Sequence, residues 1–146
     1  MGKICAFFGH REFGSDISKE LEAAVRDAIV KQGVTAFWVG GYGLFDSYAA
    51  GTVNRLKEEF PQITLHLILA YLPTGKSTVS AIYDSSIYPE GLELALPRFA
   101  ISMRNRWIVG HCDMIIAYVN HKYGGAYEAY RRAMGKIPVV NLGDLT

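Results

Sequence analysis

The stretch ICAFFGHREFGSDISKELEAAVRDAIVKQG, residues 4–33, contains the clearest indication of the fold. Its first apolar run, Ile4–Phe8, predicts a buried strand, and Gly9 ends that run. Apolar residues then recur at helical spacing over residues 15–32, which predicts an amphipathic helix that Gly33 stops. A buried strand, a glycine turn and a helix together form the first part of a parallel β–α–β unit.

The same alternation continues to the end of the chain. Four more apolar runs predict strands at Ala36–Val39, Thr64–Ala70, Met114–Val119 and Ile137–Asn141. Three more segments predict helices at Phe45–Phe60, Arg98–Gly110 and Ala126–Met134. We therefore expect an α/β, Rossmann-like fold with a mostly parallel five-stranded sheet and helices on both faces.

The length of 146 residues predicts a single domain over residues 1–146. Residues 71–97 break the alternation, because they carry three prolines and two glycines and are too long for an ordinary connection. This segment follows a predicted strand, so we expect it at the carboxyl edge of the sheet, where open α/β folds bind ligands. It is a candidate lid loop.

Composition excludes several classes of protein. Half of the residues are apolar, which indicates a real core, and 15 basic against 14 acidic residues give a net charge of +1. That balance argues against a protein whose main task is to bind a nucleic-acid backbone. No apolar run approaches the roughly 20 residues that span a bilayer, so we expect a cytoplasmic protein with no membrane partner. Cys5 and Cys112 sit in apolar runs without metal-ligand spacing, which predicts buried thiols and no metal site.

Three glycine-rich turns lie between a predicted strand and a predicted helix, at residues 9–14, 40–46 and 121–125. Glycine lets the backbone come close to a ligand, and a helix start offers unpaired N–H groups with a partial positive charge. This combination holds phosphate. Tight turns also use glycine for steric reasons alone. The pattern predicts a phosphate site that includes Gly9, Gly40, Gly41, Gly43, Gly124 and Gly125.

Charged side chains near these turns are further candidates for ligand binding. Arg11, Arg104 and Arg106 carry guanidinium groups, whose forked donors pair with phosphate oxygens. His10 could donate to a phosphate or a ribose, and Asp46 could bind a ribose hydroxyl. The structural alternatives are a solvated helix face for Arg104 and Arg106, and a favourable helix-dipole interaction for Asp46.

The chain resembles the SLOG superfamily in an ordered set of motifs that covers nearly its whole length. The motifs are FGHR at 8–11, GGYG at 40–43 with Asp46, YDSSIYPEGLE at 83–93, RNRWIV at 104–109 and GGAY at 124–127. This group includes the DNA processing protein A core, the YpsA-like proteins and the LOG phosphoribohydrolases. The resemblance is greatest to small YpsA-like and DUF-type members of bacteria and their phages. It implies a Rossmann-like fold that binds a nucleotide or a nucleotide derivative.

The LOG enzymes use an arginine, and a glutamate in a PGGxGTxxE motif, to cleave the N-glycosidic bond of a nucleoside monophosphate. The resemblance implies Arg104 or Arg106 as the counterpart of that arginine, and Glu128 as the candidate acid. Catalytic candidates are therefore Glu128 and Arg106. Here Tyr123 replaces the proline, the GT pair is absent, and Glu128 falls two residues nearer the glycines. Two residues correspond to about 200° of rotation on a helix.

Two functions of different classes remain open. The first is a sensor or binding module for a nucleotide-like small molecule, with no other cofactor. The second is a nucleoside 5′-monophosphate N-glycosidase, in which Glu128 or an acid of the lid (Asp84 or Glu90) acts as general acid or base. DNA binding is a weaker third, since nucleic acid is not an expected partner. Aromatic residues near the last two helices, Trp107, Tyr127 and Tyr130, predict a homodimer.

Overall fold

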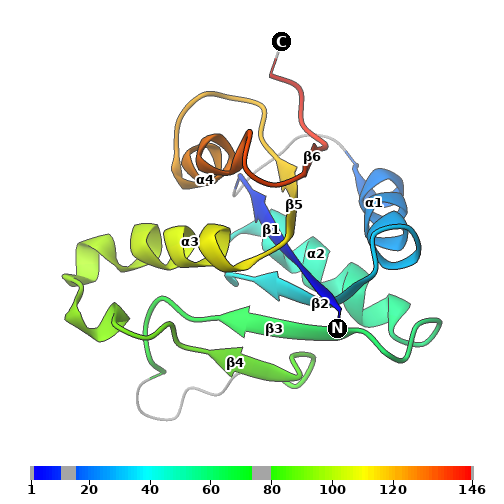
Figure 1. Cartoon of the computed structure of the whole chain (residues 1–146), viewed down its shortest axis with the longest axis horizontal. Coiled ribbons are helices and arrows are strands. Elements are labelled where there is room, and N and C mark those ends of the chain that lie inside the picture. The colour runs from blue at the N-terminus through cyan, green and yellow to red at the C-terminus, as the bar shows by residue number, and fades with distance from the viewer. Residues whose placement is uncertain (1, 11–15, 74–79, 146) are drawn as a thin grey trace.

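The computed structural model describes residues 2–10, 16–73 and 80–145. Figure 1 shows a central twisted sheet with helices on both sides. The strands are β1 (Lys3–Gly9), β2 (Val34–Val39), β3 (Thr64–Ile68), β4 (Ser85–Ile87), β5 (Met114–Tyr118) and β6 (Val139–Asn141). The helices are α1 (Ser18–Val30), α2 (Leu44–Leu56), α3 (Ala100–His111) and α4 (Gly125–Ala133). The predicted α/β, Rossmann-like fold is confirmed.

The strand order is β4-β3-β2-β1-β5-β6, and every pair in this sheet is parallel. The chain builds outward from β1 through β2 to β4, then returns to the other side of β1 with β5. The order therefore reverses between β1 and β5. Open α/β sheets bind ligands outside the carboxyl ends of the strands at such a reversal.

Alternate residues of β1 face two different cores. Cys5 and Phe7 belong to the cluster beneath α1 and α2, whereas Ala6 and Phe8 belong to the cluster beneath α3 and α4. Side chains of a strand alternate between its two faces, so a strand covered on both faces must be apolar throughout. This requirement explains the unbroken apolar run from Ile4 to Phe8.

The aromatic residues that predicted a dimer contact the protein's own core. Trp107 stacks on Trp38 with ring centroids 5.2 Å apart. Tyr127 and Tyr130 are half-buried against the cluster beneath α3 and α4, with their rings 6.4 Å apart. Packing within one chain therefore accounts for these three rings.

The predicted number of strands is wrong by one, because residues 71–97 contain β4. It pairs with β3 at the sheet edge, with Ser85 opposite His66 and Ile87 opposite Ile68. Short 3₁₀ helices follow at Leu92–Leu94 and Pro97–Phe99. Only three residues form β4, and two of them are serines. An edge strand this short and polar has no apolar run by which the sequence could reveal it.

Both cysteines are buried and free, as predicted, and burial raises the pKa of Cys112 to about 12. In the part of the chain that the structure describes, no helix is long and apolar enough to cross a membrane.

Candidate functional site

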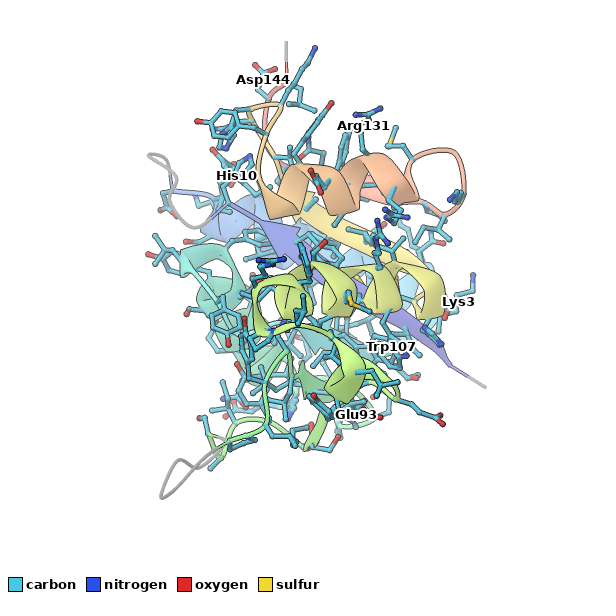
Figure 2. The ribbon with its side chains drawn as sticks, turned by 90° about the vertical axis from the view of Figure 1, so that its left-hand side faces the viewer. Lys3, His10, Glu93, Trp107, Arg131 and Asp144 are labelled. Atoms are coloured by element: carbon cyan, nitrogen blue, oxygen red, sulfur yellow. The ribbon has the colours of Figure 1, made fainter. Side chains whose placement is uncertain are left out.

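A cavity of about 280 Å³ lies at the carboxyl edge of the sheet, beside the ends of β1 and β2. Parts of all three predicted glycine turns line this central cavity. It brings together seven of the predicted ligand-binding residues: Gly9, His10, Gly40, Asp46, Arg104, Gly124 and Gly125. Arg11 lies outside the described residues. Figure 2 shows His10 beside the start of α4, where the first and third turns meet.

Arg104 connects two strand ends from beneath the cavity. Its side chain is only 3% exposed, and its Nη1 donates hydrogen bonds to the carbonyl oxygens of Gly40 at 3.0 Å and Ile68 at 2.9 Å. Its Nε donates to the Asn105 side chain at 2.9 Å. Burial lowers the pKa of Arg104, while the carboxyl of Asp46 opposes that shift. Arg104 lines the cavity, but its first role is to hold the ends of β2 and β3 in place.

Asp46 occupies the second glycine turn. It is 8% exposed, and its Oδ2 accepts the backbone N–H of Tyr42 at 3.2 Å. Burial raises the pKa of Asp46 to about 7, although the N–H groups of Tyr42, Gly41 and Gly40 and the charge of Arg104 act in the opposite direction. These N–H groups face a carboxyl group of this chain. The second turn therefore holds an internal acid where a free phosphate cradle was predicted.

Close packing or backbone conformation within the protein explains most of these glycines. A Cβ on Gly9 would lie 2.3 Å from the ring of Phe45, and one on Gly40 would lie 2.8 Å from the Arg104 guanidinium. Gly41 and Gly43 have positive φ values of 81° and 89°, and neither lines the cavity. Close packing and backbone conformation explain them without a ligand.

The start of α4 opens into the cavity. Gly124 precedes the helix with a φ of 92°, much as Gly43 precedes α2 with a φ of 89°, but Gly124 lines the cavity and Gly43 does not. No side chain of the described residues caps α4. Gly125 begins the helix without a positive φ, and a Cβ there would meet nothing nearer than the Asn105 Nδ2 at 3.6 Å. A glycine in a helix costs stability relative to alanine, so neither packing nor conformation accounts for Gly125. Its missing side chain keeps the backbone N–H groups of this helix start accessible from the cavity.

His10 adds a buried polar atom to the same cavity. The residue is 7% exposed, and its Nε2 has no hydrogen-bond partner among the described residues. Its ring stacks on His121 with centroids 3.4 Å apart, and the ring of Tyr123 lies on His121 at 4.0 Å with a tilt of 33°. Burial, followed by the proximity of His121, lowers the pKa of His10, which favours the neutral ring at pH 7. A buried polar atom without a partner is rare and points to a missing partner such as a ligand.

The two catalytic candidates lie in a neighbouring groove. Arg106 and Glu128 line a second hollow of about 240 Å³ between α3 and α4, together with Arg98 and Arg132. Neither of the two candidates lines the central cavity. The sequence analysis missed Arg98 and Arg132, although the i, i+4 spacing of Glu128 and Arg132 places both on one face of α4.

The acids of the predicted lid are not at the site. Asp84 forms an ion pair with Lys57 at 2.6 Å and accepts the backbone N–H of Leu65 at 2.8 Å. Leu65 is at the amino end of β3, which is the edge opposite the cavity. The structure therefore places Asp84 away from the central cavity, and Glu90 does not line the cavity either.

The fold has counterparts among solved structures. DNA processing protein A from Streptococcus pneumoniae matches 96% of this chain with a TM-score of 0.65 and 18% identity. The protein of the same name from Helicobacter pylori, solved for its single-stranded DNA binding mode, matches 95% with a TM-score of 0.63 and 16% identity. The molybdenum cofactor carrier protein from Chlamydomonas reinhardtii matches 95% of this chain and 76% of its own, with a TM-score of 0.55 and 17% identity.

These neighbours share the predicted Rossmann-like fold. This chain spans 50% of the Streptococcus protein and 64% of the Helicobacter protein. No family profile and no curated protein sequence matches the chain. At this identity the comparisons define the fold, and the function has to be argued from the cavity.

Proposed function

We propose that this protein binds a nucleotide or a nucleotide-derived small molecule in the central cavity, as a sensor or ligand-binding module. The observation that carries the proposal is the start of α4 at Gly124 and Gly125, which faces the same cavity as the Nε2 of His10; neither the helix start nor this nitrogen has a side-chain partner among the described residues. The helix start would hold a phosphate group. His10 would exchange a hydrogen bond with the sugar or the base.

The other walls of the cavity suit the remainder of a nucleotide. Tyr42 and Ile101 offer apolar surface, and the amide of Asn105 can both donate and accept hydrogen bonds. Small-molecule sites commonly combine apolar walls with a few convergent polar groups. A fold that also occurs in a molybdenum cofactor carrier and in a DNA-binding protein is compatible with such a ligand.

Replacement of Gly125 by alanine is expected to weaken binding of nucleoside 5′-monophosphates by about tenfold or more, without destabilising the fold. The added Cβ has room within the protein but would stand where the phosphate approaches the helix. Losing one hydrogen bond to a charged group costs about 1.5–3 kcal/mol. The measurement is calorimetric titration of the AMP, GMP, CMP and UMP series.

Gly51→Ala is the matched control, because Gly51 lies inside α2 and a Cβ there meets nothing within 4 Å. Both variants should keep or slightly raise the melting temperature, and only Gly125→Ala should lose affinity. Wild-type protein that binds none of the four nucleotides, and that carries no copurifying nucleotide by mass spectrometry, would refute the proposed function.

We expect binding without turnover. A glycosidase needs an acid or base within hydrogen-bond reach of the scissile bond, or one water away. Glu128, the candidate for this role, lines the adjoining groove and not the central cavity. Incubation with the four monophosphates should therefore release no free base by chromatography. Base release that disappears in Glu128→Gln, with binding retained, would establish the N-glycosidase instead.

A homodimer remains a prediction. Its support now comes from exposed apolar side chains around the start of α3, because Trp107, Tyr127 and Tyr130 pack within the chain. The exposed residues include Leu94 at 86%, with Leu96, Phe99 and Met103 nearby in the sequence. Exposed apolar side chains this close together in the chain are a candidate contact surface.

A further inference from the structure

The groove between α3 and α4 carries a concentration of positive charge. Arg98, Arg106 and Arg132 line it, against a single carboxylate, that of Glu128. We call this hollow the arginine groove. With three cations and one anion, it has a net charge of +2 in a chain whose total is only +1.

None of these arginines has an ion-pair partner among the described residues. Arg98, Arg106 and Arg132 are exposed, and no carboxylate in the described part of the chain lies within 4.0 Å of their guanidinium nitrogens. Arg98 packs its guanidinium over the ring of Phe99 at 4.9 Å. Guanidinium groups left free in a hollow are suited to bidentate binding of phosphate.

The arginine groove is continuous with the central cavity. Ile101, Asn105 and Gly125 line both hollows. Gly125 lies at the junction, so a phosphate at the start of α4 has the nucleoside cavity on one side and the arginines on the other. In Figure 2, α3 and α4 lie next to each other with this region between them.

We propose that the ligand is a nucleoside carrying a pyrophosphate chain, with its first phosphate at Gly125 and its second in the arginine groove. This inference rests on the proposed function, which places the nucleoside and the first phosphate. A net charge of +2 matches the additional phosphate. A free nucleoside diphosphate and a diphosphate capped by a second sugar share this chemistry.

A longer phosphate path fits the surface less well. Beyond the arginine groove lies another hollow, lined by Arg131, Arg132 and Lys136, but Glu128 lines both hollows. That hollow shares Arg132 and Glu128 with the arginine groove and adds only the charges of Arg131 and Lys136. A pyrophosphate can end in the arginine groove, whereas a bound single strand would continue past it. A net charge of +1 over the whole chain provides little positive surface for a longer backbone, so the observations favour the small molecule over single-stranded DNA.

The test compares AMP, ADP and ADP-ribose, with the corresponding monophosphates and diphosphates of the other bases, on wild type, Arg132→Gln and Arg131→Gln. The two arginines are adjacent on α4 and both exposed, but only Arg132 lines the arginine groove. Each variant removes one positive charge, so long-range electrostatic effects are matched.

For the preferred base, wild type should bind the diphosphate at least about tenfold more tightly than the monophosphate, as expected for charge-assisted hydrogen bonds. Arg132→Gln should abolish most of that gain and leave monophosphate binding unchanged, and Arg131→Gln should retain it. Tighter binding of ADP than of ADP-ribose would identify a free terminal phosphate, and the reverse would identify a sugar-capped ligand.

Monophosphate binding without any gain for the diphosphate, or a gain that survives in Arg132→Gln, would overturn this inference but leave the proposed function intact. Absence of all nucleotide binding would overturn both. Binding of a 15-nucleotide oligo(dT) that weakens equally in Arg131→Gln and Arg132→Gln would overturn the small-molecule assignment in favour of single-stranded DNA.

Discussion

Replacement of Arg104 by methionine is expected to lower the free energy of unfolding by about 3 kcal/mol or more. Methionine keeps much of the buried apolar stem but removes the donors to the carbonyl oxygens of Gly40 and Ile68. A hydrogen bond to a charged group contributes about 1.5–3 kcal/mol, and a buried carbonyl left without a partner adds its desolvation penalty. Urea denaturation at pH 7 measures the loss.

Arg106→Met is the matched control, since Arg106 lies two residues away on α3 and is exposed. Its free energy of unfolding should stay within about 0.5 kcal/mol of wild type, as is usual for surface substitutions. Equal stability of Arg104→Met and wild type would show that Arg104 does not hold the strand ends, and would return it to a purely ligand-binding role.

The fold could be predicted because its signals are local. The apolar run of β1 and the helical spacing that follows it each reflect a requirement of the parallel sheet, which buries both faces of its inner strands. The sixth strand could not be predicted, because β4 is specified by its pairing with β3 and by the Asp84–Lys57 ion pair. Such contacts join residues distant in sequence and leave no periodic pattern.

The candidate site could be predicted only as a region. Parallel strands bring their carboxyl ends to one edge, so Gly9, Gly40 and Gly124 had to lie near one another. The sequence could not reveal which turn remains open. The Asp46 carboxyl accepts the Tyr42 N–H within the second turn, and Arg104 donates from Nη1 to two carbonyl oxygens. Both facts depend on side-chain direction and burial, which spacing alone does not determine.

The position of Glu128 could be predicted in part from the sequence. Its offset of two residues from the LOG motif predicted a large rotation about the helix, and the structure places it in the arginine groove. Helical geometry could thus predict that Glu128 departs from the enzyme pattern. The arginines that surround it come partly from α3 and from the turn before it, and only the packing of α3 on α4 brings them together.

The free energy of unfolding of wild type is expected to fall by about 4 kcal/mol between pH 4 and pH 8, and that of Asp46→Asn is expected to lack this fall. Burial raises the pKa of Asp46 to about 7 in the folded protein, whereas an unfolded aspartate titrates near about 3.9. Between these values the folded state retains a proton that the unfolded state has lost. Stability therefore falls as pH rises through this window and levels off above about pH 7.

The measurement is urea denaturation at pH 4, 5, 6, 7 and 8 for wild type, Asp46→Asn and the exposed control Asp27→Asn. Asparagine can still accept the Tyr42 N–H but cannot ionise, so its profile should lack the component that wild type and Asp27→Asn share. Parallel profiles for all three proteins would show that Asp46 titrates as an ordinary aspartate.

Since Asp46 lines the central cavity, its ionisation also adds a negative charge beside the proposed phosphate site. Nucleotide affinity should consequently decline above pH 7 in wild type and decline less in Asp46→Asn, which connects the buried acid to the ligand through the same cavity.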